Sequence, residues 1–399
     1  MYRYPYGNKP GHLHRYWKLC EAQSLDRLAM RRNQSLDVLR CAAVLLVLGF
    51  HFPYYPILSR IGWMGVDLFF VLSGFLISGL LYQEYKDTGS IQFKRFILRR
   101  SLKIWPSFYL LLAGATAYSL IKPSSLLRDQ ILYNLVWLQN YHPSNSLILV
   151  HTWSLAVEEH FYLFLPILFM ALIAFRGNGN PFRAIPALFV FVSAFSLAFR
   201  WPLVQGVHAS LTHMRMDSLF AGVALGYLYH FKSNWFQKLT RHSVLALTLL
   251  LGLLLTLFGM QTMERLGTTV LFAGFSILVA WAVVRPPETW LFPAVWRLAA
   301  KIGVYSYSIY LWHTIVCSLV TNYLGWFAWA FWIYVTLAIA VGVAMAHLIE
   351  LPFLALREKR FPSLAKNAAL AVTPVRPDLQ MGRRETLWTE IAPESVVEK

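Results

Sequence analysis

The sequence is poor in charged residues and in cysteine, and each shortage excludes a class of protein. Only 14% of its 399 residues are charged, against about 25% in soluble domains, so a large soluble core is excluded. Its three cysteines have no CxxC spacing, so we predict neither a disulfide framework nor a metal site. The first 34 residues contain no short apolar run followed by a small-residue cleavage site. We therefore expect no cleaved signal peptide, with the first membrane helix serving as an uncleaved insertion signal.

Long apolar blocks dominate what is present. The composition is 57% hydrophobic, with a mean hydropathy of +0.49. The blocks are about twenty residues long, which is the length that an α-helix needs to cross a bilayer. The sequence thus predicts an all-α polytopic membrane protein with about ten transmembrane helices. The approximate spans are 36–52, 64–82, 104–121, 155–175, 184–200, 216–231, 243–260, 266–284, 302–322 and 327–350.

The net charge of +17 comes from basic residues that cluster in alternate loops. This is a topology signal, so we do not expect a nucleic-acid partner. The positive-inside rule places both termini in the cytoplasm, with the lipid bilayer as the protein's environment. We expect a basic cytoplasmic arm over residues 1–34, a transmembrane domain over 35–357, and a flexible cytoplasmic tail over 358–399.

The first span carries an unusual polar stripe. Asp37, Arg40 and His51 lie close to one face of the predicted helix, because the step of eleven residues from Arg40 to His51 makes about three turns. Arg40 and His51 are roughly 16 Å apart along the axis. Ionisable groups inside a membrane segment favour a functional site, and a histidine can take and return a proton. The alternative is that Asp37 and Arg40 pair at the membrane surface while His51 caps the other end.

A basic segment precedes the third predicted span. Within Gln92–Pro106, the residues Arg99, Arg100 and Lys103 form a cluster suited to phosphate or pyrophosphate groups. Anchoring by positive charge, or contact with anionic lipid, explains the same residues equally simply.

A third motif, HTWSLAVEEHFYLFLP, opens the fourth span from its outer side. His151, Ser154, Glu158 and Tyr162 recur at helical spacing, so they can share a face. A carboxylate at this depth needs a partner or a wet cavity. Glu158 is thus either a functional group or the partner of an arginine from another span.

Other intramembrane polar residues are fewer. Arg215 opens the sixth predicted span from the outer side, and Asp67 lies in the second. For His313, in the ninth, we favour a hydrogen-bonded packing role over chemistry. Small residues in these spans suit close helix packing, and we assign that role to Gly74, Gly222 and Gly226.

These placements suggest one arrangement. A basic mouth on the inner side binds a phosphate-bearing donor, and a histidine and a glutamate on the outer side act on an acceptor. A slender arm of the donor then runs through the helix bundle between them.

The motifs together resemble the acyltransferase-3 family of multi-pass membrane acyltransferases, over roughly residues 35–357. The motifs that match the family occur in the same order as in the family: Arg40 with His51, GVDLFFVLSGFLI, FILRRSLKIWP, WSLAVEEHFY, RMDSLFAG, GVYSYSIYLWH and IELPF. Lys103 departs from the family pattern, which has arginine there. Lysine keeps the charge but loses the bidentate geometry, which makes donor contact less certain there than at Arg100.

The resemblance implies transfer of an acyl group, most often acetyl from acetyl-CoA as donor substrate, to a hydroxyl of a carbohydrate or glycoconjugate acceptor. It also implies a bacterial inner (plasma) membrane. His51 would be the general base or a transient acyl carrier, and both roles stay open. Arg40 would orient the donor, and Glu158 would orient or polarise His51 or the acceptor. The expected cofactor-binding residues are Arg99, Arg100 and Lys103, at the CoA phosphates. The expected substrate-binding residues are Trp153, Ser154, Tyr162 and Arg215, with Trp153 and Tyr162 stacking on a sugar.

Two other functions fit parts of the sequence. A transporter or exporter of an acylated or lipid-linked molecule would also carry polar groups inside its spans, although no inverted repeat is visible. A membrane acyltransferase of another class, with a lipid or peptide acceptor, is the weaker alternative. The sequence does not determine an oligomeric state.

Overall fold

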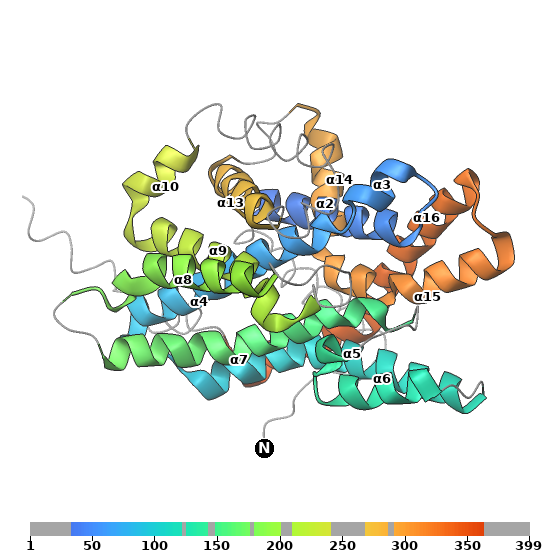
Figure 1. Ribbon diagram of the computed structural model, residues 1–399, viewed down its shortest axis with the longest axis horizontal. Helices are drawn as coiled ribbons and strands as arrows, with labels where there is room; N and C mark the ends of the chain where they lie inside the picture. The colour runs from blue at the N-terminus through green and yellow to red at the C-terminus, as the bar shows by residue number, and fades with distance from the viewer. Residues whose placement is uncertain are drawn as a thin grey trace, which may run out of the picture.

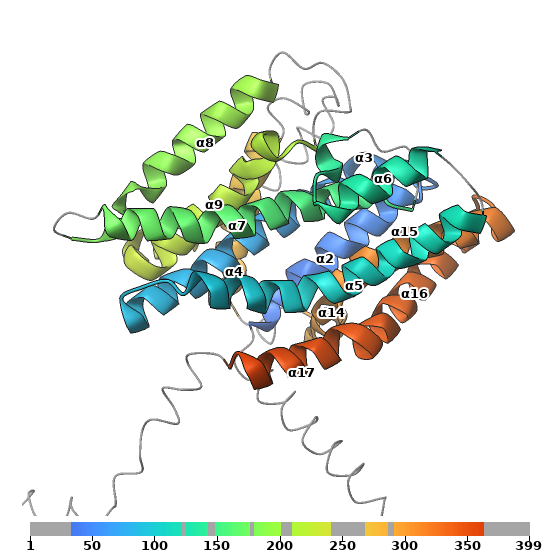
Figure 2. The same ribbon diagram turned by 90° about the horizontal axis from the view of Figure 1, so that it is seen from below.

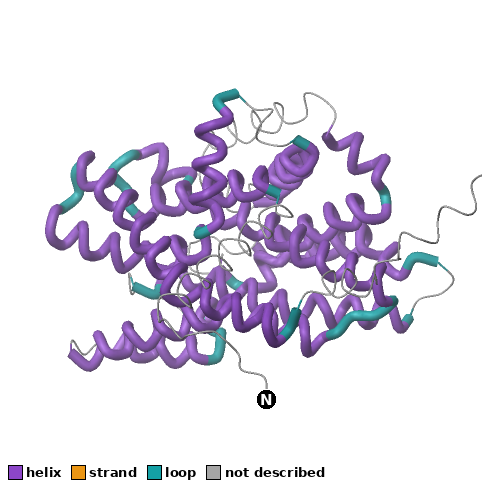
Figure 3. The backbone as a smooth tube through the Cα atoms, turned by 180° about the vertical axis from the view of Figure 1, so that it is seen from behind, coloured by secondary structure: helices purple, strands orange, loops and turns teal. Residues whose placement is uncertain are grey.

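The computed structural model describes residues 33–121, 125–142, 148–175, 179–200, 210–240, 268–285 and 291–362. Within these ranges the chain is helical and forms no strand, and short loops join the helices (Figure 3). The all-α prediction is therefore confirmed for the described part of the chain.

Six stretches of the described chain are long and apolar enough to cross a membrane. They match six of the predicted spans, which supports a membrane protein. These stretches are α2 (Gln34–His51), α4 (Met64–Thr88), α5 (Phe93–Ile121), Val150–Ala174 with η2 (Val150–Thr152) and α7 (Trp153–Ala174), Pro181–Arg200 with η3 (Pro181–Ala184) and α8 (Ile185–Arg200), and Ala328–Arg360 with α16 (Ala328–Met345), the π-helical turn η7 (Ala346–Glu350) and α17 (Leu351–Arg360).

The four other predicted spans have different outcomes. Span 216–231 falls in α9 (Thr212–Phe231), whereas span 302–322 covers the last residues of α14 (Pro293–Val304) and most of α15 (Ser306–Leu324). None of these helices is among the six. Span 266–284 falls in α13 (Thr268–Val284), whose apolar part is shorter, and span 243–260 lies outside the described residues. The total of ten spans and the sides of the termini stay predictions. The remaining helices are α3 (Pro56–Ile61), α6 (Ser125–Leu135), η1 (Gln139–Tyr141) and α10 (Ser233–Thr240).

The basic segment, which precedes the third predicted span, is helical from Phe93 onward. Figure 2 shows α5 (Phe93–Ile121) as one long helix, which contains all of the segment except Gln92. No glycine interrupts residues 93–105, and Pro106 is accommodated inside the helix. Successive side chains on a helix point about 100° apart. Arg99 and Arg100 therefore face different directions, while Arg100 and Lys103 lie close to one face.

The most extensive helix–helix contact among the described residues is between α4 and α9, which lie side by side in Figure 1. Glycine makes this contact possible. A Cβ atom on Gly74 would lie 1.9 Å from the carbonyl oxygen of Leu219, and one on Gly222 would lie 2.3 Å from that of Val71. Side chains at these positions would push the helices apart, so the predicted packing role of both glycines is confirmed. The contact holds α4 in position beside the site described next.

Candidate active site

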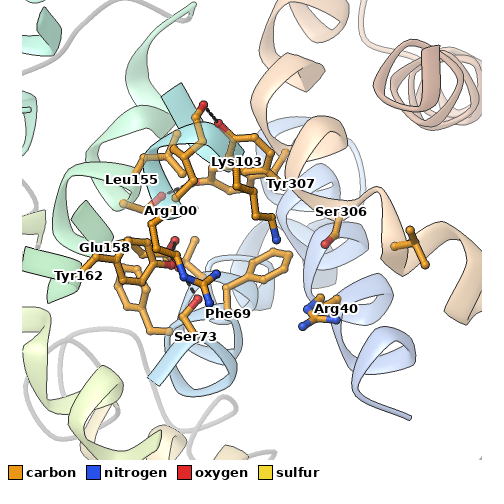
Figure 4. A pocket seen from close by; sticks show the side chains of 16 residues that line it. Arg40, Phe69, Ser73, Arg100, Lys103, Leu155, Glu158, Tyr162, Ser306 and Tyr307 are labelled. Carbon is orange, nitrogen blue, oxygen red and sulfur yellow. Dashed lines mark hydrogen bonds between the residues drawn. The ribbon is translucent and has the colours of Figure 1, made fainter. Parts of the chain in front are cut away.

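A cavity of about 110 Å³ lies between α2, α4, α5, α7 and α15. Its polar lining comes from helices that are far apart in the sequence (Figure 4). The polar lining residues are Arg40, Ser73, Arg100, Lys103, Ser154, Glu158, Tyr162, Ser306, Tyr307 and Tyr310.

Charged side chains meet at this cavity. Arg100 and Lys103 reach it from α5, Arg40 reaches it from α2, and Glu158 from α7 (Figure 4). Glu158 accepts hydrogen bonds from Ser73 Oγ at 2.7 Å and from the hydroxyl of Tyr162 at 2.9 Å. A carboxylate inside a helix bundle is tolerated when such donors and nearby cations compensate for its lost hydration. The cavity thus has an excess of positive charge around one carboxylate.

The predicted polar face of the fourth span is confirmed for three of its four residues. Ser154, Glu158 and Tyr162 recur every four residues along α7, and all three line the cavity. His151 lies one turn earlier, in η2, and is not a lining residue.

The first helix, α2, has a side-chain cap at its N-terminus. The side chain of Asn33 caps α2 by accepting hydrogen bonds from the backbone N–H groups of Ser35 and Leu36. The pairing of Asp37 with Arg40, which the sequence offered as the alternative to a functional role, is present as an ion pair one turn apart. Arg40 also lines the cavity. Arg40 therefore pairs with Asp37 and lines the cavity at the same time.

His51, at the other end of α2, belongs to a cluster of three histidines. Its ring centroid is 4.7 Å from that of His313 on α15, and the His313 centroid is 5.0 Å from that of His151. Nδ1 of His51 is 3.0 Å from the carbonyl oxygen of Val47. We assign the proton to Nδ1, because a carbonyl oxygen can only accept. Nε2 of neutral His51 then carries the lone pair, which is the form that a general base requires.

A hydroxyl pair connects the histidine cluster with the cavity. The hydroxyl of Tyr310 donates to the carbonyl oxygen of His151 at 2.8 Å and lies 2.5 Å from Ser154 Oγ. Tyr310 and Ser154 both line the cavity, whereas His51 does not. Glu158 was expected to act on His51 or on the acceptor, and no direct contact between Glu158 and His51 is among those that the described residues form.

Arg99 points away from the cavity. Its guanidinium forms an ion pair of 2.8 Å with Glu358 and donates a hydrogen bond to the carbonyl oxygen of Phe361. Both partners belong to the C-terminal end of α17 or follow it directly. Arg99 therefore ties α17 to α5, and its neighbour Arg100 is the residue that enters the cavity.

Arg215 and Trp153 also lie outside the cavity lining. Arg215 is buried and pairs with Asp67 at 3.1 Å, and its guanidinium lies 5.5 Å from the ring of Trp153. Ser218 Oγ adds a hydrogen bond to Asp67 at 3.0 Å. This buried pair connects α9 to α4.

Sequence reasoning missed two features of the site. Ser73 donates to Glu158, although it looked like a small packing residue in an apolar span. The histidines 51, 151 and 313 come from three distant parts of the chain. Nε2 of His313 is buried and has no hydrogen-bond partner among the described residues. Burying a polar atom without a hydrogen-bond partner costs about 1–3 kcal/mol.

Comparisons with known proteins agree on one family. The model of an acyltransferase domain matches residues 33–350. A Staphylococcus aureus (strain MSSA476) protein, named as a candidate O-acetyltransferase, is 32% identical over 353 residues, covering 81% of this chain and 58% of the relative. The peptidoglycan O-acetyltransferase OatA of Listeria monocytogenes is 28% identical over 323 residues, covering 74% of this chain and 51% of the relative. The chain thus spans little more than half the length of these relatives. No solved structure matches it.

Proposed function

The chain belongs to the acyltransferase-3 family, and on that basis we propose that it is a membrane O-acetyltransferase. In this proposal it moves an acyl group, most simply acetyl, from acyl-CoA to a hydroxyl of a carbohydrate. The carbohydrate class rests on the relatives, which include a peptidoglycan O-acetyltransferase. The observation that carries the proposal is the cavity, in which Arg40, Arg100 and Glu158 from the family motifs meet.

The size and charge of the cavity support a role in holding the arm of the donor that leads to its thioester. A volume of about 110 Å³ is below the roughly 150 Å³ of an engineered cavity that binds benzene. It suits the slender arm of an acyl-CoA, which carries the thioester on toward His51, but not a nucleotide. Arg100 and Lys103 supply positive charge that can polarise a carbonyl or hold a phosphate. The nucleotide would lie outside, beside the first turns of α5, where Arg99 holds α17.

His51 is the proposed base. Its Nε2 takes the proton of the acceptor hydroxyl, and the hydroxyl oxygen attacks the acyl carbon. The C–S bond breaks, and the departing CoA thiolate receives the proton from His51. In the other route, Nε2 attacks the acyl carbon first, and the C–S bond breaks to release CoA thiolate. The acceptor hydroxyl oxygen then attacks the acyl carbon, the C–N bond to the histidine breaks, and the hydroxyl proton passes to the thiolate. Both routes regenerate neutral His51.

Glu158 and Tyr162 act on the donor side in this proposal. Their hydrogen bond keeps both in the cavity wall, and the carboxylate balances the charges of Arg100 and Lys103. Arg40 closes the opposite wall. His51 lies roughly 16 Å along α2 from Arg40. Such a spacing suits a donor from the cytoplasm and an acceptor at the other membrane surface. Trp153 and Arg215 then support the acceptor side through the buried pair with Asp67.

The test compares His51→Ala with His347→Ala, which changes an exposed histidine. Envelope glycans from cells that express each variant at equal membrane levels are examined by mass spectrometry. We expect the acetyl mass on the glycan to disappear with His51→Ala and to remain with His347→Ala. Retention of the acetyl mass in His51→Ala cells would refute the mechanism.

A further inference from the structure

We propose that a second pocket, beside Trp153, binds a hydroxyl group of the carbohydrate acceptor. The idea rests on the proposed function, in which a sugar receives the acyl group, and it names the residues that hold this sugar. The pocket lies where α6, η1, η2 and the first residue of α7 meet. We call it the Gln139 pocket, and its polar lining includes Tyr133, Asn134, Gln139, His142, Thr152 and Trp153.

Two buried polar atoms of lining residues have no hydrogen-bond partner. Gln139 is 5% exposed, and its Nε2 donates to the carbonyl oxygen of Thr152 at 3.0 Å, which fixes the end of the amide that carries the oxygen. That oxygen, Oε1, is buried without a partner among the described residues, and so is Nδ1 of His142. Leaving such an atom unpaired costs about 1–3 kcal/mol. A bound hydroxyl has a hydrogen for the amide oxygen and lone pairs for an imidazole N–H.

Two other polar side chains of the Gln139 pocket are already hydrogen-bonded, so the wall that they form is set before a ligand arrives. Thr152 Oγ1 donates to Asn134 Oδ1 at 2.8 Å, and Asn134 Nδ2 donates to the carbonyl oxygen of Gln130 at 2.7 Å. The pocket has a volume of about 10 Å³, which is close to the space that one water molecule needs. It therefore receives a single hydroxyl rather than a whole sugar ring.

Aromatic rings of the same pocket suit the rest of a sugar. The ring of His142 is stacked on that of Tyr133, with centroids 4.2 Å apart and planes at 25°. Tyr133 is 38% exposed, and Trp153 adds a second large ring to the lining. A pyranose presents C–H groups on its faces, which pack on aromatic rings, and hydroxyls at its edge. A lipid chain would leave the Gln139 oxygen unpaired, so the pocket favours a carbohydrate over a lipid acceptor.

The short helix η2 connects the Gln139 pocket with the histidine cluster. Thr152 lines the pocket, whereas the ring of the preceding residue, His151, has its centroid 5.0 Å from that of His313. The His313 centroid is in turn 4.7 Å from that of His51. A saccharide that is anchored in the pocket by one hydroxyl is thereby held near the proposed base, with its other hydroxyls free to reach it.

The test is His142→Phe, because phenylalanine keeps a ring against Tyr133 but removes both nitrogens. His347→Phe, the same substitution at an exposed histidine, is the control. Initial rates are measured with acetyl-CoA and with chitotetraose, a tetramer of N-acetylglucosamine, as the acceptor. We expect His142→Phe to raise the KM for chitotetraose about 3–10-fold, the equivalent of one neutral hydrogen bond. The KM for acetyl-CoA stays unchanged, because His142 does not line the donor cavity, and His347→Phe changes neither value.

Monodeoxy analogues of chitotetraose, used as competitors of the transfer, separate binding in the pocket from a structural effect. One analogue is expected to bind wild type about 3–10-fold more weakly than the parent saccharide does. The same analogue and the parent should bind His142→Phe equally, because both changes remove the same hydrogen bond. Thermal unfolding and size-exclusion elution in detergent check folding. If His142→Phe does not fold, Gln139→Met takes its place, since methionine keeps the length of the side chain without its amide.

Three outcomes decide between the explanations. An unchanged KM for chitotetraose in the folded variant would overturn the role of the Gln139 pocket. Equal weakening of the parent and of every analogue by the substitution would overturn it as well, since a purely structural role predicts that result; in both cases transfer by wild type leaves the proposed function standing. Absence of transfer by the wild-type protein in the same assay would overturn the proposed function, and this inference with it.

Discussion

A single methyl group placed between α4 and α9 is expected to disturb both the fold and the site. In Gly74→Ala, the new Cβ would lie 1.9 Å from the carbonyl oxygen of Leu219. The ordinary C···O contact distance is about 3.3 Å, and neither backbone can yield locally. The two helices must therefore separate by more than about 1 Å.

The size of the effect follows from that separation. Overpacking of this kind costs about 1–3 kcal/mol. Ser73, the preceding residue, donates to Glu158 at 2.7 Å, and a shift of about 1 Å would stretch this bond beyond the hydrogen-bonding range. We therefore expect Gly74→Ala to lower the Tm by several degrees and to reduce acyl transfer as well.

Gly114→Ala is the matched control, because Gly114 lies in α5 with open space around its Cβ position. Both variants gain the helix propensity of alanine, worth about 1 kcal/mol, so their difference isolates the clash. The assay is thermal unfolding of purified protein in detergent, with transfer measured on the same samples. A Tm for Gly74→Ala equal to or above that of Gly114→Ala would refute the packing argument.

Two further predictions concern charged residues. Arg100→Ala should raise the KM for acyl-CoA about 10–100-fold, the equivalent of one charge-assisted hydrogen bond. Arg99→Ala should raise this KM much less, because Arg99 is held by Glu358 outside the cavity. Initial rates against acyl-CoA concentration measure both values, and equal increases would contradict the placement of Arg100 alone in the cavity. Arg215→Gln should cost about 3–5 kcal/mol by leaving Asp67 charged and unpaired in the core. The double variant with Asp67→Asn should recover much of that loss in thermal unfolding, and a double variant no more stable than the single one would be evidence against the buried pair.

Local spacing predicted the parts of the site that lie on one helix. The four-residue repeat of Ser154, Glu158 and Tyr162 is set by the helix itself, and so is the pairing of Asp37 with Arg40. Such features need no knowledge of which helices are neighbours.

Contacts between distant segments could not be predicted in the same way. Arg99 and Arg100 are adjacent in a basic motif, yet Arg99 pairs with Glu358 and Arg100 enters the cavity. The family resemblance made Arg215 an expected substrate-binding residue. Its partner Asp67 lies on another helix, so local spacing gave no sign of the pair. The contact of His313 with His51 could not be predicted either, because His51 comes from the first described helix.

The central claim is that this chain transfers an acyl group by using His51. The most direct measurement is the movement of label from acetyl-labelled CoA to a glycan acceptor by the purified protein in liposomes. The account predicts labelled glycan and free CoA with wild type and with His347→Ala, and neither product above background with His51→Ala. Transport of an acylated glycan without consumption of acetyl-CoA, or undiminished transfer by His51→Ala, would contradict it.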